Sequence, residues 1–318
     1  MNGIRIAACS RAIPARKVSN DDLSRQVDTS DEWIRTRTGI LNRYYCEEES
    51  CLSLAVEASR RVLEKADVDP AEIGAVLVAT ATADYAFPST ACLIQKECGL
   101  PEDITAFDIN AACSGFLMGM AVARGLFDSM DKRYILLIGA EQLSRILDPT
   151  DRSTCVLFGD GAGAVLLERA PGRMIQKTWA KGSLSALCCP GVGKNGARLT
   201  MKGNEVFRFA VTAMIHAISD VLEEAALSME DIDLVVCHQA NERIIRYVQK
   251  RFPGNEDKFF INIGEYGNTS AASIPIALSE CEDRGILRRC RRILLVGFGA
   301  GLSWSGLLVE TAEGGAEK

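Results

Sequence analysis

One cysteine lies where a predicted strand gives way to an apolar helix. Cys113 follows the apolar run 104–109 after a few small residues, and the stretch 116–127 behind it has almost no polar face. A helix that is apolar all round is buried inside a domain. Its first turn offers free backbone N–H groups and the positive end of the helix dipole, and both stabilise a thiolate. We therefore weigh a nucleophilic Cys113 with a lowered pKa against an ordinary small core residue.

Two more polar side chains stand at comparable places in the second half of the chain. His238 ends the predicted strand 232–237, and Asn268 precedes the apolar helix 271–281. Each alone is weak, because His238 could be a satisfied polar residue and Asn268 a simple helix cap. Cys113 can carry an acyl group as a thioester. His238 and Asn268 can each supply one N–H donor to the same substrate oxygen. Backbone N–H groups of the turn at Ala300 could face the thioester carbonyl. Because these residues supply hydrogen-bond donors and no strong base, they suggest a site that stabilises an enolate.

The elements that must position these side chains occur twice. The segments 134–141 and 155–168 resemble 292–299 and 301–310, and FDINAACSGF at 107–116 occupies the same place as FINIGEYGNTSAAS at 260–273. Strands alternate with helices in both halves, which predicts an α/β protein with a mostly parallel sheet in each half. We expect two similar halves packed face to face. Residues 1–170 carry the nucleophile and 171–318 carry His238 and Asn268, with the turn-rich stretch 171–200 as linker.

Composition narrows the class of protein. The chain has 318 residues, 47% of them hydrophobic and 25% charged, with a formal net charge of −6. These values are ordinary for a globular protein and argue against nucleic acid as a partner. No membrane span and no signal peptide are expected, so we predict a cytoplasmic location. Twelve scattered cysteines without a C-x-x-C pair predict reduced thiols, and no metal site is expected.

Several local patterns allow two interpretations. The glycines at 159, 161 and 163 suggest a dinucleotide loop, but a strand follows them instead of a helix, so we predict a hairpin turn at Asp160-Gly161. Thr29 and Glu32 have the spacing of a capping box that begins the next helix. That helix brings Trp33 near Arg35, Arg37 and Arg43, which is either a solvated face or a site for an anionic ligand with a ring.

The helix expected at 242–251 carries a basic patch. Arg243, Arg246, Lys250 and Arg251 recur at steps of three and four residues. Cations near the end of a helix complement its dipole, which accounts for Lys250 and Arg251. Arg243 lies in the first turns, where the dipole disfavours a cation, so we expect another interaction to stabilise it.

With these motifs in view, the whole chain resembles the β-ketoacyl-acyl-carrier-protein synthase III family of the thiolase superfamily. The motifs that carry the resemblance are DTSDEWIRTRTGI at 28–40, AFPSTAC at 86–92, FDINAACSGF at 107–116, DPTDR at 148–152, FGDGAGA at 158–164, MKGNEVFRFAV at 201–211, HQAN at 238–241, GNTSAAS at 267–273 and FGAGLSW at 298–304. The resemblance implies a thiolase-like fold with layers in the order αβαβα. It implies that a short acyl-CoA primer, acetyl-CoA in the first place, is condensed with malonyl-acyl carrier protein, which initiates fatty acid synthesis.

The resemblance also implies roles for individual residues. Cys113 would be acylated, His238 and Asn268 would stabilise the enolate from malonyl decarboxylation, and the amides of Cys113 and Ala300 would form the oxyanion hole. The other implied sites are the CoA nucleotide site (Trp33, Arg37, Arg152), the pantetheine channel (Asn204, Phe207, Ala240, Asn241), the partner subunit's acyl pocket in a homodimer (Phe87) and the carrier-protein surface (Arg208, Arg243, Lys250). Acyl-CoA is a substrate, so no cofactor is expected.

The chain departs from the family pattern in a few places that bear on the primer pocket. Ser305 replaces a common glycine, the 171–200 region is short, and it holds the unusual pair Cys188-Cys189. The leading alternative is a related acyltransferase of a secondary, polyketide-type pathway. A hydroxymethylglutaryl synthase would need a glutamate base, and no glutamate stands out in the sequence. A papain-like protease has the same order of Cys, His and Asn but a different cysteine motif. A non-catalytic binding protein would not need the intact trio.

Overall fold

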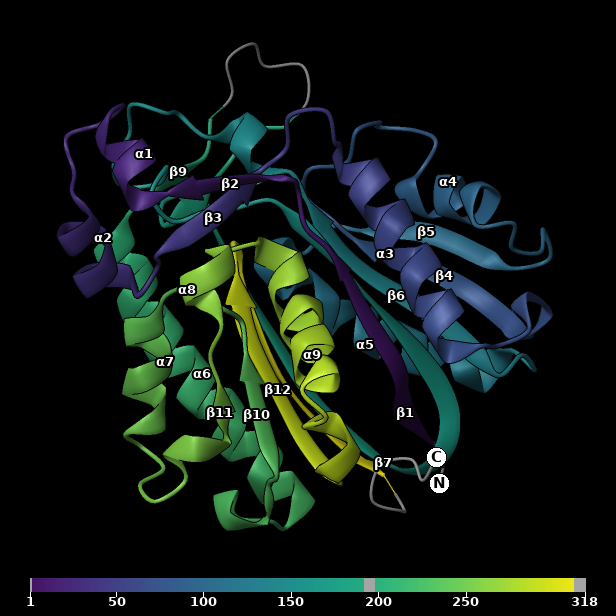
Figure 1. The fold of residues 1–318 in the computed structure, drawn as a ribbon. Coiled ribbons are helices and arrows are strands. Elements are labelled where there is room, and N and C mark those ends of the chain that lie inside the picture. The colour runs from purple at the N-terminus through teal and green to yellow at the C-terminus, as the bar shows by residue number, and fades with distance from the viewer. Residues whose placement is uncertain (1, 192–197, 312–318) are drawn as a thin grey trace.

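The fold is built on one extended sheet whose two halves repeat each other. A computed structural model describes residues 2–191 and 198–311 (Figure 1). The main strands are β1 (Asn2–Ala12), β4 (Ile73–Ala79), β5 (Thr105–Ile109), β6 (Tyr134–Glu141), β7 (Gly161–Ser183), β10 (Leu234–Cys237), β11 (Phe259–Phe260), β12 (Arg292–Gly299) and β13 (Gly301–Thr311). They follow the order β11-β10-β12-β13-β7-β6-β4-β5, and β1 also pairs with β7.

Helices and short strands complete the element list. The α-helices are α1 (Asn20–Ser24), α2 (Asp31–Thr38), α3 (Cys51–Ala66), α4 (Thr90–Glu97), α5 (Gly115–Ser129), α6 (Gly203–Ala225), α7 (Glu242–Gln249), α8 (Ile263–Tyr266) and α9 (Ser273–Asp283). The short strands are β2 (Arg16–Ser19), β3 (Asn42–Tyr45), β8 (Leu187–Cys188) and β9 (Thr200–Met201). In the described part of the chain, every helix is too short or too polar to cross a membrane.

The internal repeat predicted from the sequence is confirmed strand by strand. In the first half β4, β5 and β6 are parallel and β7 returns antiparallel to β6, while in the second half β10, β11 and β12 are parallel and β13 returns antiparallel to β12. The first part of β7 pairs with β1, and the second part of β7 pairs with β13. The second part of β7 therefore has the position in the second half that β1 has in the first. One long strand therefore serves both halves.

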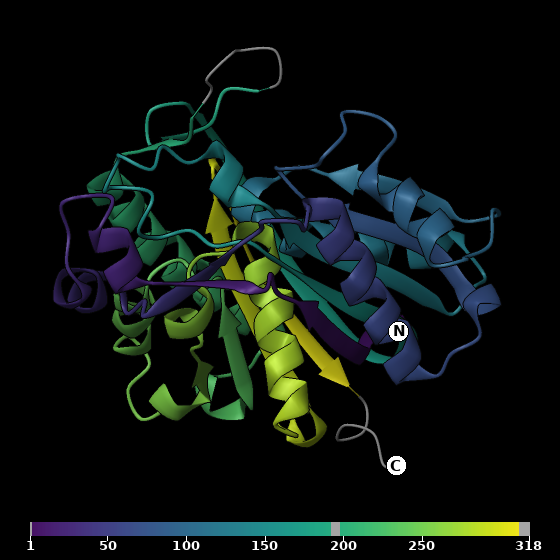
Figure 2. The same ribbon diagram turned by 45° about the horizontal axis from the view of Figure 1, so that its top comes forward.

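Three hydrophobic cores lie between the layers of helices and strands. The central core joins α5 and α9 to the inner faces of both half-sheets, with Phe116, Leu117 and Leu278 among its buried residues. A second core lies under α3 and α4, and a third under α6 and α7. Figures 1 and 2 show these outer helices on opposite sides of the molecule, with α9 between them. The expected αβαβα order of a thiolase-like fold is confirmed.

The predicted linker is wrong over its first part, and the predicted hairpin is wrong. Residues 171–183 are the second part of β7, which crosses the boundary expected at residue 170 without a break; 192–197 lie outside the described residues. Asp160 precedes β7 and is buried, and its carboxylate accepts hydrogen bonds from the backbone N–H groups of Cys46 and Ser144. Gly163, one of the glycines that suggested a dinucleotide loop, instead allows close packing, since a Cβ there would lie 2.6 Å from the nitrogen of Ile276.

The N-terminal arm of α1, α2, β2 and β3 lies beside α7 and α8 (Figure 1). The predicted capping box at Thr29 is wrong by one residue, because the side chain of Ser30 accepts the hydrogen bond from the Trp33 N–H. Arg43 does not belong to the basic surface expected there. It is fully buried, and its guanidinium donates to the Val156 carbonyl and to the side chain of Asn20. Arg43 therefore ties the arm to the body of the protein.

Candidate active site

Cys113 lies on a sharp elbow at the end of β5. A single turn of 3-10 helix, Ala112–Ser114, connects the strand to α5, and Ala112 has a φ of +46°. Non-glycine residues with positive φ are uncommon and cluster at functional sites. The side chain of Asn110 accepts a hydrogen bond from the Ala112 N–H and supports the turn. The elbow thus places the thiol at the carboxyl end of the sheet, where α/β folds bind their ligands.

A second elbow repeats this geometry in the C-terminal half. The turn Ser270–Ala272 leads into α9, and Ser270 has a φ of +49°. Asn268 takes the place of Asn110, since its side-chain oxygen accepts the Ser270 N–H at 2.9 Å. Because that oxygen is occupied, the amide NH₂ of Asn268 is the group left to donate. The interpretation of Asn268 as a turn-capping residue and its implied role as a donor are therefore compatible.

His238 is held as a neutral donor. It is buried, and burial lowers the pKa of its imidazole to about 3. Its Nδ1 lies 2.6 Å from the Ser273 hydroxyl, which also accepts the Gln239 N–H. Ser273 can then donate its own proton to Nδ1, which leaves the proton of the imidazole on Nε2. Nε2 is buried and has no hydrogen-bond partner among the described residues. An oxygen of a bound substrate would satisfy this donor.

The lowered pKa expected for Cys113 is wrong for the structure as it stands. Burial raises the pKa of the thiol to about 12, and a hydrogen bond with Ser270 only partly offsets the rise. The N-terminal turn of α5 was expected to stabilise the thiolate, but the loss of hydration dominates because the thiol lies deep in the fold. Cys113 is thus a protonated thiol that must lose its proton when it reacts.

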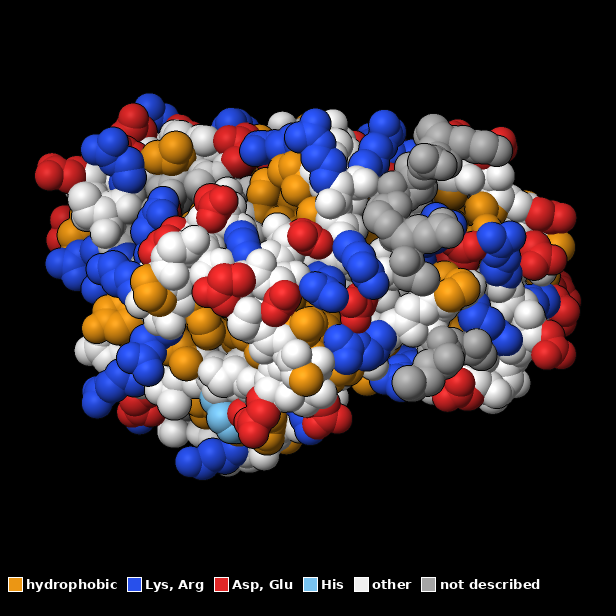
Figure 3. Space-filling view, turned by 90° about the horizontal axis from the view of Figure 1, so that it is seen from below, with side chains coloured by type: hydrophobic (Ala, Val, Ile, Leu, Met, Phe, Trp, Pro, Cys, Tyr) orange, Lys and Arg blue, Asp and Glu red, His pale blue; other side chains and the backbone are white. Residues whose placement is uncertain are grey.

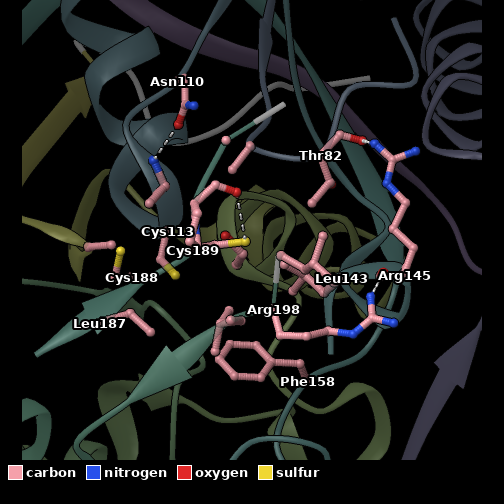
Figure 4. A pocket seen from close by; sticks show the side chains of 18 of the residues that line it. Thr82, Asn110, Cys113, Leu143, Arg145, Phe158, Leu187, Cys188, Cys189 and Arg198 are labelled. Atoms are coloured by element: carbon pink, nitrogen blue, oxygen red, sulfur yellow. Dashed lines mark hydrogen bonds between the residues drawn. The ribbon is translucent and has the colours of Figure 1, made fainter. Parts of the chain in front are cut away.

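One cavity of about 600 Å³ opens onto Cys113 (Figure 4). Besides Cys113 its lining includes Ala300, Ser270, Leu143, Phe158, Cys188 and Cys189. The cysteine pair that departs from the family pattern therefore faces the site, whereas Ser305 does not line the cavity and donates its hydroxyl to the Lys177 carbonyl between β13 and β7. All twelve cysteines are free thiols, as predicted.

Ala300 is fixed against the elbow of Cys113. Its carbonyl accepts a hydrogen bond from the Ser303 hydroxyl, which lies 2.8 Å from the hydroxyl of Ser114. A Cβ at Gly299 would lie 2.9 Å from the backbone nitrogens of Cys113 and Ser114, so only glycine lets the two loops approach this closely. The structure therefore places the loop of Ala300 directly against the elbow of Cys113.

Trp33, Arg37 and Arg152 also come together, although they lie far apart in the sequence. The guanidinium carbons of Arg37 and Arg152 lie 4.8 and 4.7 Å from the centre of the Trp33 ring. Both arginines are exposed, and the tryptophan is half-buried. Such an assembly offers two cations and an aromatic ring to one ligand.

The residues implied for the pantetheine channel come from the first turns of α6 and from the start of α7. Asn241 caps α7 and donates its side-chain amide to the Arg37 carbonyl at 3.1 Å. Arg243 lies over the ring of Phe207 at 5.5 Å, a cation–π contact that the sequence did not predict and that favours a cation in the first turn of α7. Ala240 is buried just before this helix, and Asn204 is exposed on the first turn of α6.

The remaining predicted residues lie on the surface. Arg208 on α6, Arg243 on α7 and Lys250 at the end of α7 are exposed, whereas Arg246 is paired with Glu242. Phe87 is 85% exposed, the highest value among the large hydrophobic side chains described.

Three polar residues at the centre of the site were not predicted from the sequence. Ser273 orients His238, Ser270 contacts Cys113, and Glu141 accepts the Ser270 hydroxyl at 2.9 Å. The sequence does single out Glu141 in one respect, since it is a carboxylate that directly follows the apolar strand 134–140. A carboxylate in that position lies either inside the protein or at the edge of the sheet. The two serines could have been found by aligning the second elbow with the first.

Comparison with known proteins agrees with this geometry. Two family models match, described as 3-oxoacyl-[acyl-carrier-protein (ACP)] synthase III over residues 107–182 and as its C-terminal part over 222–311. Similar proteins named beta-ketoacyl-[acyl-carrier-protein] synthase III come from Clostridium novyi, with 43% identity over 98% of this chain and 99% of that protein, and from Coxiella burnetii, with 42% identity over 98% and 100%.

Solved structures show the same relationship. The 3-oxoacyl-[acyl-carrier-protein] synthase III of Aquifex aeolicus VF5 has a TM-score of 0.91 and 41% identity, covering 97% of this chain and 100% of its own. The priming beta-ketosynthase of the R1128 polyketide pathway has a TM-score of 0.91 and 34% identity, covering 98% and 97%. Fold and site together define a condensing acyltransferase of the thiolase fold. The identity over nearly the whole chain then shows that it belongs to the 3-oxoacyl-[acyl-carrier-protein] synthase III family.

Proposed function

We propose that this enzyme condenses a short acyl-CoA primer, acetyl-CoA in the first place, with malonyl-acyl carrier protein to give 3-oxoacyl-carrier protein and begin fatty acid synthesis. The single observation that carries the proposal is the elbow of Cys113 facing a second elbow that holds Asn268 and orients His238. Acyl-CoA and the carrier are substrates, and the proposal needs no cofactor. A cytoplasmic location fits the twelve free cysteines.

In the first half-reaction the Cys113 sulfur attacks the primer thioester and CoA leaves. The developing oxyanion would be stabilised by the amides of Cys113 and Ala300, whose loops are held together by Ser114 and Ser303. The adenine ring would stack on Trp33, and Arg37 and Arg152 would bind the phosphates. The pantetheine arm would pass Asn204, Phe207, Ala240 and Asn241 on its way to the cavity.

In the second half-reaction malonyl-carrier loses CO₂. The thioester oxygen of the enolate would accept hydrogen bonds from His238 Nε2 and the Asn268 amide. A neutral imidazole suits this step because its proton lies on the nitrogen that is buried without a partner in the described part of the chain. The enolate carbon then attacks the acyl carbon on Cys113, the bond between that carbon and the sulfur breaks, and the released thiolate takes up a proton from water.

A homodimer fits the exposed edge of the first half-sheet. β5 ends the strand order, and an unprotected edge strand is a ready site for pairing with a second copy. Phe107 on this strand is 36% exposed, and Phe87 projects from the segment between β4 and α4. In such a dimer Phe87 would enter the acyl pocket of the partner.

The dimer can be tested with Phe87→Asp. We expect the wild type to be a dimer. The variant should already be monomeric at protein concentrations at which the wild type is still dimeric, because a charge replaces an apolar contact. Sedimentation equilibrium measures the two dissociation constants. Tyr247→Asp is the control. It removes an exposed aromatic ring from a different element, α7, and should remain dimeric. A monomeric wild type would contradict the dimer.

The carrier would dock on the exposed cations of α6 and α7. We expect Arg243→Glu to raise the KM for malonyl-carrier and to leave acetyl-CoA loading almost unchanged, and Arg208 and Lys250 should behave similarly. Opposite-charge patches chiefly raise association rates and weaken with salt. Added salt should therefore slow carrier turnover in the wild type more than in the variant.

Arg289→Glu is the matched control for this charge reversal. Arg289 is exposed and lies just before β12, at the opposite end of that strand from Ala300 and Cys113. Figure 3, which shows the molecule from below, has side chains of both charges interspersed on that face. Carrier turnover should be normal in this variant. Equal losses in both half-reactions of Arg243→Glu would mean that the patch is structural or binds CoA.

The proposed function is tested by reconstitution with acetyl-CoA and malonyl-carrier. We expect CO₂ and 3-oxobutyryl-carrier in equal amounts, detected by mass spectrometry of the carrier. A panel of longer and branched acyl-CoA primers tests the polyketide-type alternative, which would be favoured if acetyl-CoA were inert and a longer primer reacted.

A further inference from the structure

A buried carboxylate lies behind the nucleophile. Glu141 ends β6 and is 0% exposed. Its carboxylate accepts hydrogen bonds from the hydroxyls of Thr82 and Ser270 and from the Ala81 N–H. These partners are neutral, so they do not balance a negative charge, and burial raises the pKa of Glu141 to about 7. A carboxylic acid in this condition can take up a proton near neutral pH.

Ser270 connects this carboxylate to the thiol. Its hydroxyl donates its one proton to Oε1 of Glu141 at 2.9 Å, so its oxygen is the group that accepts the S–H of Cys113. Once the protons have shifted, the Ser270 O–H donates to the Cys113 sulfur and favours the thiolate. Ser270 and Cys113 line the same cavity, each on its own elbow. The positive φ of Ser270 and the hydrogen bond from its N–H to Asn268 fix the hydroxyl in this place.

The charges favour an exchange between the two groups. Negative charge on Glu141 raises the pKa of Cys113, so two anions side by side are unfavourable. If the proton that leaves Cys113 moves to Glu141, the buried pair keeps a single negative charge throughout. His238 is poorly suited to this task, because its pKa is about 3 and its Nδ1 is occupied by Ser273.

We propose that Glu141, acting through Ser270, accepts the thiol proton of Cys113 during primer loading; the inference rests on the proposed function. The S–H proton passes to Ser270 Oγ as the Ser270 O–H proton passes to Glu141 Oε1. The thiolate forms its bond to the primer carbonyl carbon, and the bond between that carbon and the CoA sulfur breaks. The departing CoA thiolate takes the proton back from Glu141 along the same path.

Other titratable groups around Glu141 do not interfere near neutral pH. Cys51 on α3 shares its electrostatic field, and burial raises the pKa of that thiol to about 12. The nearby Arg145 and Asp84 form an ion pair at 2.8 Å. A change in loading near pH 7 would therefore report on Glu141.

The test compares Glu141→Gln with the wild type in both half-reactions. The unprotonated carboxylate is the active form, so wild-type loading from acetyl-CoA should rise with pH and level off above about 7. Glutamine keeps the shape and a hydrogen bond to Ser270 but accepts no proton. We expect loading to fall by about 100-fold, typical of a lost general base, and the inflection to vanish. Decarboxylation of malonyl-carrier should persist.

Two further variants separate the relay from a structural effect. Ser270→Ala breaks the path while leaving the carboxylate, and should slow loading like Glu141→Gln. Thr82→Val removes a different hydrogen bond that lowers the pKa of Glu141, so the inflection should move to higher pH. Rapid-quench intact-mass measurements supply the rates.

The proposal is overturned if Glu141→Gln and Ser270→Ala load at the wild-type rate, or if loading and decarboxylation fall together in both. If neither variant folds, the wild type decides alone: a loading rate with no inflection near pH 7 contradicts the role of Glu141. A wild type that forms no adduct on Cys113 would instead contradict the proposed function itself.

Discussion

Cys113→Ala should form no acyl-enzyme and should lose condensation completely, while slow decarboxylation of malonyl-carrier continues. The cavity would keep its shape, since the change removes only one sulfur atom from the elbow between β5 and α5. His238 and Asn268 are held by Ser273 and by the Ser270 N–H rather than by Cys113, so their donors remain in place. Covalent catalysis would therefore be lost and enolate stabilisation retained.

Intact-mass spectrometry after incubation with acetyl-CoA measures the adduct, and release of CO₂ from malonyl-carrier measures decarboxylation. Cys98→Ala is the control, because Cys98 is half-buried at the end of α4 and does not line the cavity. That variant should load normally. If Cys113→Ala still carried one acetyl group, another cysteine would be the nucleophile.

The second large effect is expected for the two donors. His238→Ala and Asn268→Ala should load the primer and fail to decarboxylate malonyl-carrier. Loss of one preorganised donor to a developing oxyanion costs about 3–4 kcal/mol, a factor of about 10²–10³ in rate. Because burial keeps the pKa of His238 at about 3, the wild-type decarboxylation rate should show no loss at mildly acidic pH from protonation of this ring.

Single-turnover rates for the two half-reactions separate the possible outcomes for these variants. Ser273→Ala is a useful companion, since it frees Nδ1 and allows the imidazole proton to leave Nε2, and it should weaken decarboxylation while loading stays normal. Blocked loading with normal decarboxylation in either His238→Ala or Asn268→Ala would require the assigned roles to be exchanged.

The repeat of the two halves was predictable because strand-ending motifs are local in sequence. Apolar strands such as 134–140 and 292–299 and the two small-residue elbows identified the halves without any contact information. The same reasoning placed Cys113, His238 and Asn268 at the carboxyl edge of the sheet, and the structure confirms these positions.

The errors arise where long-range packing overrides a local pattern. Turn residues at 171–183 predicted a linker, but pairing with β13 extends β7 through them. Asp160-Gly161 has the sequence of a tight turn, yet Asp160 is buried, and its carboxylate accepts hydrogen bonds from Cys46 and Ser144. Arg43 reads as a surface cation, and its partners Val18, Asn20 and Val156 come from distant segments.

The thiol pKa of Cys113 shows the same limit at the site. A helix N-terminus can be recognised in a sequence, but the depth of burial that raises this pKa depends on how the two halves meet. The sequence marks Glu141 as a carboxylate at the end of an apolar strand, but only the fold places the end of β6 beside the second elbow.

The role of Cys113 as the nucleophile is tested by finding where the primer is held in the wild-type enzyme. The protein is incubated with acetyl-CoA alone, quenched in acid, digested and analysed by mass spectrometry. We expect one acetyl group per chain, as a thioester on the peptide that contains Cys113, and this group should disappear when malonyl-carrier is added. An unmodified Cys113, or an acetyl group stable to malonyl-carrier on Cys188 or Cys189, would contradict this role.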